Sequence, residues 1–491
     1  MKLLHFLLNS LRAIAHTLLL LLLLLAVFIA LRILQSEQVD STEQLASKSA
    51  YLEGIASQQK DRSKRPNVIF ILFDDMGYGD IGPGASDNQL VNTPNIDQLA
   101  ADGIVLTDFY SPASTCTASR AGFLTGRLPA RAGMPYVIFP SHTARGVVLG
   151  KILNPEANNR LPSEEIILAD LFRAAGYATG MVGKWHLGDA SPSLPNDMGF
   201  DSFYGSLYSN DMKPFALYRD EAIAVEAPVD QRRLTELYTA EATRFIETHS
   251  TENFFLYFAH NFPHDPLAVR TELSGKSDAG LYGDVLEEID GSIGAIVATL
   301  EHTGNLNNTL IIISSDNGPW FLGNAGDHRG RKGNTFEGGM RVPFIAHWPA
   351  AISGGQVSPA MAMGIDLMPT MLDILGFPAP SDRILDGRSI LDVLTRGAES
   401  PHDYIYYYDG ETLFAVRDQR FKYRGPAGVF YSTDELPFAP AMPQKEWLFD
   451  LQEDRRESYD TSDRHPEDLK RLRAAFAAKV TEMEANKRGW R

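Results

Sequence analysis

Two pairs of oxygen-bearing side chains stand just after apolar runs that are typical of buried strands. Asp74 and Asp75 directly follow the run NVIFILF, and Asp316 and Asn317 come one residue after the run TLIIIS. Ligands of open parallel sheets bind beyond the carboxyl ends of the strands. If these strands are neighbours, three carboxylates and one amide oxygen converge, and an all-oxygen set suits Ca²⁺ or Mg²⁺ rather than zinc. Either pair alone can equally cap a loop or a helix, but two pairs at two strand ends favour a metal site.

The chain has one cysteine, Cys116, in the polar stretch SPASTCTASRAGFLTGR. The hydroxyl side chains around it can cap a helix over residues 118–124, which places the sulfur beside a helix N-terminus, where free N–H groups favour an anion. Arg120 lies one helical turn further along, on the same face. A lone cysteine is usually an inert apolar side chain, but these polar neighbours favour a functional one. A single cysteine also excludes an internal disulfide and any metal site built from several cysteines.

The elements that must position these groups alternate between strand and helix. Continuous apolar runs predict strands buried on both faces, and apolar residues at helical spacing predict the helices between them. The alternation predicts an α/β fold with a mostly parallel central sheet and helices on both faces. Strands are expected at 67–73, 105–110, 178–182, 254–259 and 309–314, and helices at 94–101, 164–175, 231–247 and 281–302.

The pattern changes after about residue 385. Short aromatic-rich runs between residues 404 and 451 predict a small antiparallel sheet. A helix that begins at Pro466 carries an apolar stripe, so we expect it to pack on that sheet. These features divide this part of the chain into a catalytic domain, residues 65–385, and a C-terminal subdomain, residues 386–491.

The first 34 residues are expected to target the protein rather than to join its fold. Lys2 and Arg12 precede an apolar run with eight consecutive leucines, which is long enough to cross a membrane as a helix. Arg32 follows directly and no small-residue cleavage site stands out, so an uncleaved signal anchor is favoured over a cleaved signal peptide. Because the positive charges stay in the cytoplasm, we expect an exported, membrane-anchored protein with its catalytic domain in the periplasm or outside the cell. Residues 35–64 are predicted to be a polar linker.

The composition excludes several other classes of protein. The 491 residues carry 45 Lys and Arg against 62 Asp and Glu, a formal net charge of −17. Since a nucleic-acid-binding face must be basic, we expect no nucleic-acid partner. Hydrophobic residues make up 44% of the chain, which is ordinary for a folded globular protein. The sequence also lacks a P-loop phosphate-binding run, so a P-loop nucleotide hydrolase is not expected.

Cys116 begins the stretch CTASR, which with the following AGFLTGR resembles the maturation signal of the type I sulfatase family in the alkaline phosphatase superfamily. In that family a maturation enzyme oxidises the cysteine to formylglycine (3-oxoalanine), whose hydrated aldehyde is the nucleophile. Ala118 stands where many members have proline. Further stretches resemble the arylsulfatase A and N-acetylgalactosamine-6-sulfatase branch over about residues 66–460, namely PNVIFILFDDMGYGD, TPNIDQLAADG, GKWHLG, FFLYFAHNFPHDPL, SSDNGPW and GRKGNTFEGGMRVP, in that order.

This resemblance implies an arylsulfatase-type sulfuric ester hydrolase that cleaves aryl sulfates or sulfated carbohydrates. Its partners would be a sulfated small molecule or glycan as substrate and a formylglycine-generating maturation enzyme. It implies Ca²⁺ as the metal, with Asp74, Asp75, Asp316, Asn317 and residue 116 as ligands. It also implies Cys116 as the nucleophile, Arg120 as the residue that holds it, Lys184 and His186 beside it, His264 near the leaving group, Lys332 as the sulfate clamp and Ser209 as a sulfate contact, with Lys184, Ser209, His264 and Lys332 binding the substrate.

The mechanism that the resemblance implies is an in-line attack on sulfur. One hydroxyl of the hydrated aldehyde at residue 116 attacks, and Ca²⁺ polarises that nucleophile and one sulfate oxygen. Asp316 can take the proton of the nucleophile, and His264 or Lys332 can give one to the departing oxygen. His186 would then deprotonate the second hydroxyl, which expels sulfate and restores the aldehyde.

Several of these residues have plainer explanations in isolation. Lys184 and His186 alternate along an extended segment, and a solvated strand face would explain them equally well. His264 can simply satisfy a loop carbonyl, as we expect for His260. Lys332 lies among arginines, and a cluster of charges is usually a wet surface.

Two other functions remain open on the residues alone. The same scaffold can hydrolyse phosphonate or phosphate esters, and an unmodified cysteine would leave a catalytically silent protein that binds sulfated glycans. No motif identifies the alcohol part of the substrate. We expect the loops near residues 210–228 and 382–404 to select it.

Overall fold

The computed structural model describes residues 1–35, 40–58, 65–82, 90–153, 158–426 and 445–491. Within these residues, ten strands form one sheet in the order β11-β2-β10-β9-β1-β8-β4-β5-β6-β7. The central run from β9 to β5 is parallel, so the predicted α/β fold with a mostly parallel sheet is confirmed. The strands are β1 (Asn67–Phe73), β2 (Ile104–Leu106), β4 (Ala178–Lys184), β5 (Ser202–Ser206), β6 (Leu217–Arg219), β7 (Ala222–Val225), β8 (Phe254–Ala259), β9 (Thr309–Ser315), β10 (Phe344–His347) and β11 (Gln356–Ser358), and β3 (Phe109–Tyr110) pairs apart from them with β12 (Ala362–Met363).

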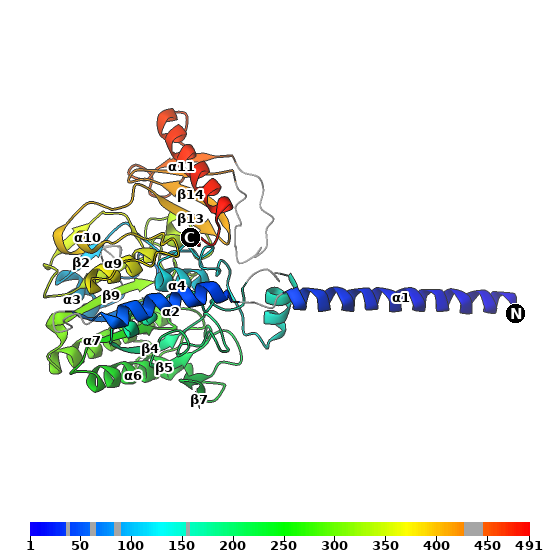
Figure 1. Ribbon diagram of the computed structural model, residues 1–491, viewed down its shortest axis with the longest axis horizontal. Coiled ribbons are helices and arrows are strands. Elements are labelled where there is room, and N and C mark those ends of the chain that lie inside the picture. Colours follow the sequence, from blue (N-terminus) through cyan, green and yellow to red (C-terminus); the bar gives the residue numbers. More distant parts are fainter. Residues whose placement is uncertain (36–39, 59–64, 83–89, 154–157, 427–444) are drawn as a thin grey trace.

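Helices cover both faces of this sheet, which is why all seven residues of β1 are buried (Figure 1). Successive side chains of a strand point to opposite faces. Accordingly Phe70 joins a core with the helices of one face, and Ile71 joins a second core with those of the other. The first core takes in α4 (Cys116–Thr125), α5 (Leu168–Ala174) and α9 (Leu367–Leu375), and the second takes in α3 (Pro94–Ala101), α6 (Leu234–Thr248) and α7 (Gly280–His302).

The strands that carry the predicted metal ligands are direct neighbours. β1 pairs in parallel with β9, and Phe73 lies opposite Ser315. Both strands therefore end at the same edge of the sheet, and the acidic residues that follow them emerge side by side.

A second, smaller sheet lies above the first in Figure 1. Its four strands are antiparallel, and a long helix packs against them through Leu472 and Phe476, as predicted. These elements are β13 (Ile405–Asp409), β14 (Thr412–Arg417), β15 (Phe421–Arg424), β16 (Trp447–Asp450) and α11 (Pro466–Ala485). The predicted boundary at residue 386 lies too early, because α10 (Leu391–Arg396) places Val393 and Leu394 in the core of the larger sheet.

The prediction of a polar linker over residues 35–64 is wrong for its middle part. Residues Thr42–Ser57 form α2, which packs on the catalytic domain. Lys48 Nζ donates to the carbonyls of Ser163 and Glu165 and pairs with Asp170 at 2.8 Å. Ile55 is buried in the core. The polar composition of this segment suggested an exposed linker. The segment is instead a packed helix, because one of its polar side chains, Lys48, bonds to the catalytic domain.

The N-terminal helix α1 (Lys2–Gln35) extends away from the rest of the protein (Figure 1). Its segment Leu4–Leu34 is long and apolar enough to cross a membrane. Near its end, Arg32 Nε donates to the carbonyl of Ile152 at 2.9 Å. Ile152 belongs to the short helix η2 (Gly146–Leu153).

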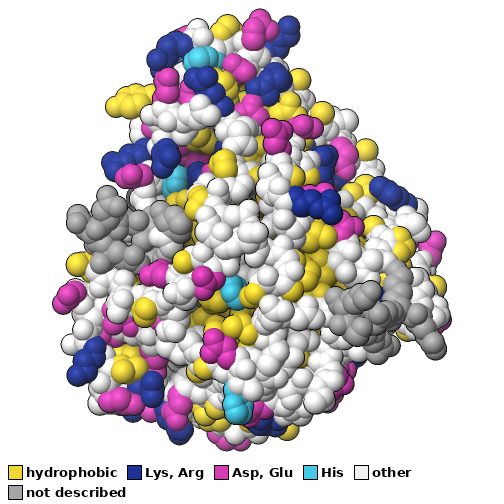
Figure 2. Space-filling view, turned by 90° about the vertical axis from the view of Figure 1, so that its left-hand side faces the viewer, with side chains coloured by type: hydrophobic (Ala, Val, Ile, Leu, Met, Phe, Trp, Pro, Cys, Tyr) yellow, Lys and Arg dark blue, Asp and Glu magenta, His cyan; other side chains and the backbone are white. Residues whose placement is uncertain are grey.

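The face of the protein opposite α1 carries both signs of charge. In Figure 2, Lys and Arg side chains on this face are interspersed with Asp and Glu. This face therefore shows no large patch of one sign.

Candidate active site

The ends of β1 and β9 bring the four predicted metal-binding side chains together. The Asp75 N–H donates to Asp316 Oδ1 at 3.2 Å, and Asn317 Nδ2 donates to Asp75 Oδ1 at 2.7 Å. Asp74, Asp75, Asp316 and Asn317 are all buried. Asp75 has a left-handed φ of 68°, a strained conformation for a residue with a Cβ. Strain of this kind persists only where the surroundings enforce it.

These oxygens suit a hard divalent cation. Ligand atoms of Asp74, Asp75, Asp316 and Cys116 lie within 4.8 Å of one another. Oδ1 of Asp74 and Oδ1 of Asn317 are buried and have no hydrogen-bond partner among the described residues. Buried acceptors are rarely left unpaired, and carboxylate and amide oxygens are the ligands that Ca²⁺ prefers. The residues present therefore fit the predicted ion.

Three cationic side chains surround the carboxylates. Lys184 Nζ donates to Asp74, and Lys332 Nζ lies 2.7 Å from Asp75 Oδ1. Arg120 Nε donates to Asp316 Oδ2 at 2.9 Å, and its Nη1 donates to the Lys184 carbonyl at 2.8 Å. Each carboxylate thus has its own cation, which compensates for removal of the charges from water.

The crowding of negative charge is visible in the pKa values. Burial and the neighbouring Asp74 carboxylate raise the pKa of Asp316 to about 7. Burial alone would also raise the pKa of Asp74, but the Lys184 ammonium and other nearby cations hold it well below its usual range. One of these carboxyls is therefore hard to ionise unless more positive charge enters the site.

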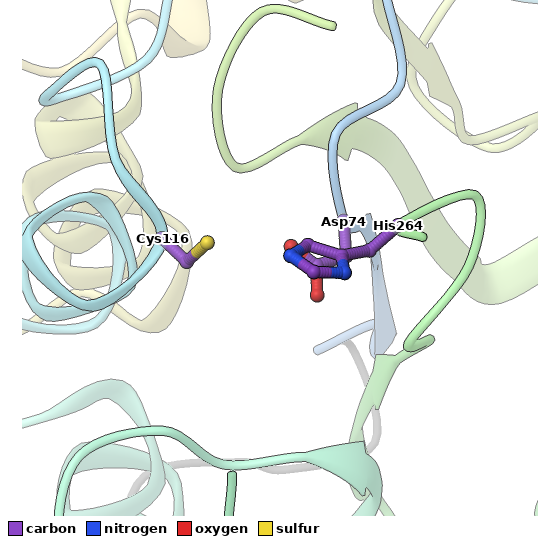
Figure 3. A group of neighbouring side chains, drawn as sticks. All are labelled: Asp74, Cys116 and His264. Atoms are coloured by element: carbon purple, nitrogen blue, oxygen red, sulfur yellow. The ribbon is translucent and has the colours of Figure 1, made fainter. Parts of the chain in front are cut away.

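Cys116 begins α4 and faces the metal-binding edge of the sheet. Figure 3 shows its sulfur pointing toward Asp74 and His264 across the site. Burial raises the pKa of the unmodified thiol to about 12, so it is not a thiolate at neutral pH. The expected side-chain cap of α4 is not formed, because Thr115 makes no capping hydrogen bond. An unmodified thiol at this position would be a poor nucleophile.

His186 is held in one tautomer. Its Nε2 lies 3.0 Å from the Ile138 carbonyl, and a carbonyl can only accept, so Nε2 carries the proton. Nδ1 is buried without a partner among the described residues. Burial and the nearby Lys184 charge lower the pKa of His186 well below its usual value. The explanation of Lys184 and His186 as a solvated strand face is wrong, since both are fully buried.

His264, Ser209 and Lys184 form a second group beside the acids. Ser209 Oγ lies 3.3 Å from Lys184 Nζ and 3.4 Å from His264 Nε2, and that nitrogen is 3.8 Å from Asp75 Oδ2. His264 Nδ1 donates to the carbonyl of Asp265. The plainer explanation of His264, a hydrogen bond to a loop carbonyl, is therefore correct for Nδ1. The other nitrogen of the ring, Nε2, faces Ser209 and Asp75 in the site. The predicted serine lies among the predicted cationic and titratable groups.

Lys332 does not lie on a wet surface. Its side chain is only 14% exposed. Its backbone N–H donates to the Pro319 carbonyl at 3.0 Å, and the Gly333 N–H donates to the Ser114 carbonyl at 2.8 Å. These bonds tie the lysine loop both to the segment after β9 and to the segment before Cys116.

A cavity of about 400 Å³ opens onto this cluster, and Cys116 is among its lining residues. Arg145 also lines it, and no motif in the sequence marked this residue. Trp320, the last residue of the SSDNGPW stretch, and Asp211, in the loop near residues 210–228, line it as well. Of the two loops expected to select the substrate, 210–228 contributes to the lining, whereas 382–404 does not contribute any described residue. The geometry combines an anion-binding pocket, a cation site and a buried base.

Comparison with known proteins agrees with the sequence resemblance. The family model for Sulfatase matches residues 66–377, and the one for the C-terminal region of N-sulphoglucosamine sulphohydrolase matches residues 331–485. N-acetylgalactosamine-6-sulfatase of Mus musculus is 38% identical over 380 residues, covering 73% of this chain and 71% of that protein. Arylsulfatase A of Bos taurus is 33% identical over 470 residues, covering 85% of this chain and 89% of that protein.

Solved sulfatase structures have the same fold as this chain. A sulfatase from a Pseudoalteromonas species superposes with a TM-score of 0.75 at 28% identity, covering 91% of this chain and 95% of that one.

Proposed function

This chain belongs to the sulfatase family and is a sulfuric ester hydrolase, and from that premise we propose that it removes sulfate from a sulfated carbohydrate in the cavity lined by Cys116. One observation carries the proposal: three cations pair with a cluster of acidic oxygens beside residue 116, which lines a pocket. Small aryl sulfates would serve as surrogate substrates. The curated relatives named above act, by their names, on N-acetylgalactosamine 6-sulfate and on aryl sulfates.

The chemistry would need two groups that the polypeptide acquires. Asp74, Asp75, Asp316 and Asn317 would hold Ca²⁺, which supplies Lewis-acid polarisation of a sulfate oxygen when bound. Residue 116 would act as formylglycine, whose hydrate supplies the attacking hydroxyl. The high pKa of the thiol is a physical reason for this modification, because the cysteine itself would remain protonated.

The chain's own side chains would bind the sulfate and move protons. Lys184, Ser209 and Lys332 would hold the nonbridging oxygens, where positioning and charge neutralisation matter most for such transfers. Arg120 would fix residue 116 and Asp316. These groups neutralise a fixed anion without being consumed.

Two histidines would transfer protons, His186 at residue 116 and His264 at the departing alcohol. His186 Nδ1 is unprotonated, so it can accept a proton from residue 116. His264 or Lys332 would protonate the departing alcohol, and the charge of an incoming sulfate favours the protonated form of His264. Asp316 could accept the first proton from the nucleophile.

The site would work outside the cytoplasm. We take α1 as an uncleaved signal anchor that holds residues 35–491 in the periplasm or outside the cell. The catalytic domain begins near residue 65 and includes α10, and the small antiparallel sheet with α11 is the C-terminal subdomain. A formylglycine-generating enzyme would act on the CTASR stretch. The apolar length of α1 and the lone cysteine support this arrangement.

Peptide mass spectrometry and kinetics together test the proposal. Replacement of the thiol by an aldehyde lowers the mass of residue 116 by about 18 Da, and active exported protein should carry that change. Cys116→Ser should keep the fold and lose turnover of 4-nitrophenyl sulfate. Intact thiol in fully active protein would refute the nucleophile, and faster hydrolysis of 4-nitrophenyl phosphate than of the sulfate would favour the phosphate ester alternative.

A further inference from the structure

The loop that carries Lys332, residues 329–337, is bonded to the catalytic domain at Lys332 and Gly333, but its two ends are held by the C-terminal subdomain. At its start, Arg329 Nη1 donates to the backbone carbonyl of Glu457 at 2.9 Å. At its end, the Glu337 N–H donates to Glu457 Oε2 at 2.7 Å. One residue outside the catalytic domain thus bonds to both ends of the loop.

Glu457 is itself fixed from the other side. Its Oε1 lies 2.9 Å from Lys422 Nζ, and Lys422 also donates to Glu337 Oε1 at 3.0 Å. All three side chains are fully buried. Glu457 has a left-handed φ of 50°, which turns the chain at this point. A buried ion network of this kind leaves little freedom to its members.

The middle of the loop is held by the same subdomain. Arg424 Nη1 donates to the Thr335 carbonyl at 3.1 Å. Phe336 is buried, and the guanidinium groups of Arg329 and Arg424 each lie 4.1 Å from its ring. With its ends and middle fixed, the loop can present Lys332 in only a narrow range of positions.

We propose that Glu457 is a positioning residue for Lys332, so that the C-terminal subdomain sets the reach of the sulfate-binding lysine into the active site. This inference rests on the proposed role of Lys332. A misplacement of about 1 Å at a reacting centre can cost on the order of a hundredfold in rate, so loss of one anchor should be visible in kinetics.

A double-mutant cycle tests this proposal. Glu457→Ala should lower kcat/KM on 4-nitrophenyl sulfate about tenfold, whereas in a Lys332→Ala background it should change kcat/KM less than about twofold. Glu457→Gln retains an oxygen that can accept from the Glu337 N–H, so it should restore most of the activity. Glu482→Ala is the control. It removes a side-chain carboxylate of the C-terminal subdomain that pairs with Arg131, away from the Lys332 loop, and should leave kcat/KM unchanged.

The outcomes separate the two proposals. An equal loss from Glu457→Ala in both backgrounds would overturn the positioning role and leave only a structural one. If Glu457→Ala does not fold, Arg329→Gln removes the other end of the same anchor and enters the same cycle. Full activity of Lys332→Ala would instead refute the proposed role of the lysine itself.

A second observation concerns the wall of the cavity. Arg145 lines it, is exposed, and has its guanidinium 4.2 Å from the ring of Phe139, another lining residue. Lys332 is paired with Asp75. By contrast, Arg145 makes no ion pair with any residue that the structure describes. In a chain with a net charge of −17, a guanidinium that faces the substrate pocket and has no carboxylate partner in the described part of the chain is suited to bind an anion on the ligand.

We infer that Arg145 binds a second anionic group, a carboxylate or another sulfate, on the alcohol part of the substrate. The substrate would then be a polyanionic sulfated carbohydrate rather than a singly charged ester. Guanidinium groups pair with both of these anions through two parallel hydrogen bonds. This inference rests on the proposed function and adds a charge requirement to it.

Matched substrates test the inference. A disaccharide with one sulfate ester and one uronate carboxylate would be compared with the same disaccharide reduced to the alcohol, and with a form that carries a second sulfate instead. Arg145→Gln should raise KM about tenfold or more for whichever charged form Arg145 recognises and little for the neutral form. Lys151→Gln, a nearby charge loss outside the cavity lining, is the control. An equal rise for all three substrates would overturn the inference, whereas absence of wild-type turnover of 4-nitrophenyl sulfate would refute the proposed function instead.

Discussion

His186 and His264 face the same cavity with different nitrogens free. The His186 Nε2–H donates to the Ile138 carbonyl, which leaves Nδ1 as the basic atom. The His264 Nδ1–H donates to the Asp265 carbonyl, which leaves Nε2 toward Ser209. Backbone carbonyls thus select the tautomer at each position, a choice that residue type alone does not determine.

His260, a third buried histidine, should make stability depend on pH. Its Nδ1 accepts from the Phe262 N–H, and burial lowers its pKa to about 3. The unfolded chain, with an ordinary pKa near 6.5, binds the proton more readily, so stability is lost as pH falls from about 6.5 toward 3. From this residue alone, the free energy of unfolding should fall by about 3 kcal/mol between pH 7 and pH 4.5.

Denaturant unfolding at the two pH values measures this effect. His260→Asn keeps an acceptor for the Phe262 N–H but cannot titrate, so its loss of stability between pH 7 and pH 4.5 should be smaller by that amount. His142→Asn, a change at an exposed side chain, serves as the control. The same pH dependence in His260→Asn and the wild type would contradict the prediction.

At the scale of elements, β4 delivers Lys184 and then His186, and the backbone of β4 at Gly183 has a conformation that suits only glycine. Gly183 pairs with Ala259 and has a φ of 111°. A Cβ at Gly183 would meet the Ala259 carbonyl oxygen at 1.9 Å. The glycine is therefore required both by its conformation and by the neighbouring strand.

Gly183→Ala should damage both stability and activity. The strained φ and the clash should cost about 3 kcal/mol in the free energy of unfolding, and the shift of β4 should lower kcat/KM by displacing Lys184. Gly291→Ala is the matched control, because Gly291 lies in α7 with open space around its Cβ position. That change should stabilise the protein by up to about 1 kcal/mol. Similar melting temperatures for the two variants would show that β4 tolerates the side chain.

Elements with a strong local signal were predictable, and those set by tertiary contacts were not. The continuous apolar runs gave β1, β8 and β9 nearly to the residue. The strand predicted at 105–110 instead splits into β2 and β3, and Asp108 between them pairs with Arg341. The helix α2 was missed because its apolar residues are few. A partner distant in sequence decides both cases.

The same distinction holds for the candidate site. Its eleven predicted residues lie together, and all of them except Ser209 belong to the motifs quoted from the sequence. Arg145 and Glu457 belong to no such motif. Arg145 lines the cavity and Glu457 bonds to the loop of Lys332. Both are contacts between residues far apart in the sequence, so they can be identified only in the folded chain.

At the scale of the whole molecule, an acidic protein must attract an acidic substrate. The formal charge is −17, yet Lys332 and Arg145 line one cavity. Lys184, which contacts the lining residue Ser209, and Arg120, which donates to the Lys184 carbonyl, are buried beside it. A local cluster of cations in a pocket with low-dielectric walls can outweigh the more distant negative charges. Such attraction weakens with salt.

The N-terminal segments should differ in how much the catalytic domain needs them. A chain of residues 36–491 loses α1, which is exposed along its apolar length, so it should be soluble and keep its kcat/KM on 4-nitrophenyl sulfate. A chain of residues 65–491 also loses α2. It leaves Asp170 without Lys48 and exposes the site of Ile55, which should cost about 4 kcal/mol. Thermal melting of both chains measures the difference. Lys48→Met in the longer chain removes only the lysine contacts of α2 and should therefore lower the melting temperature less than removal of the whole helix. Equal melting temperatures for the two chains would mean that α2 is the dispensable linker that its composition suggests.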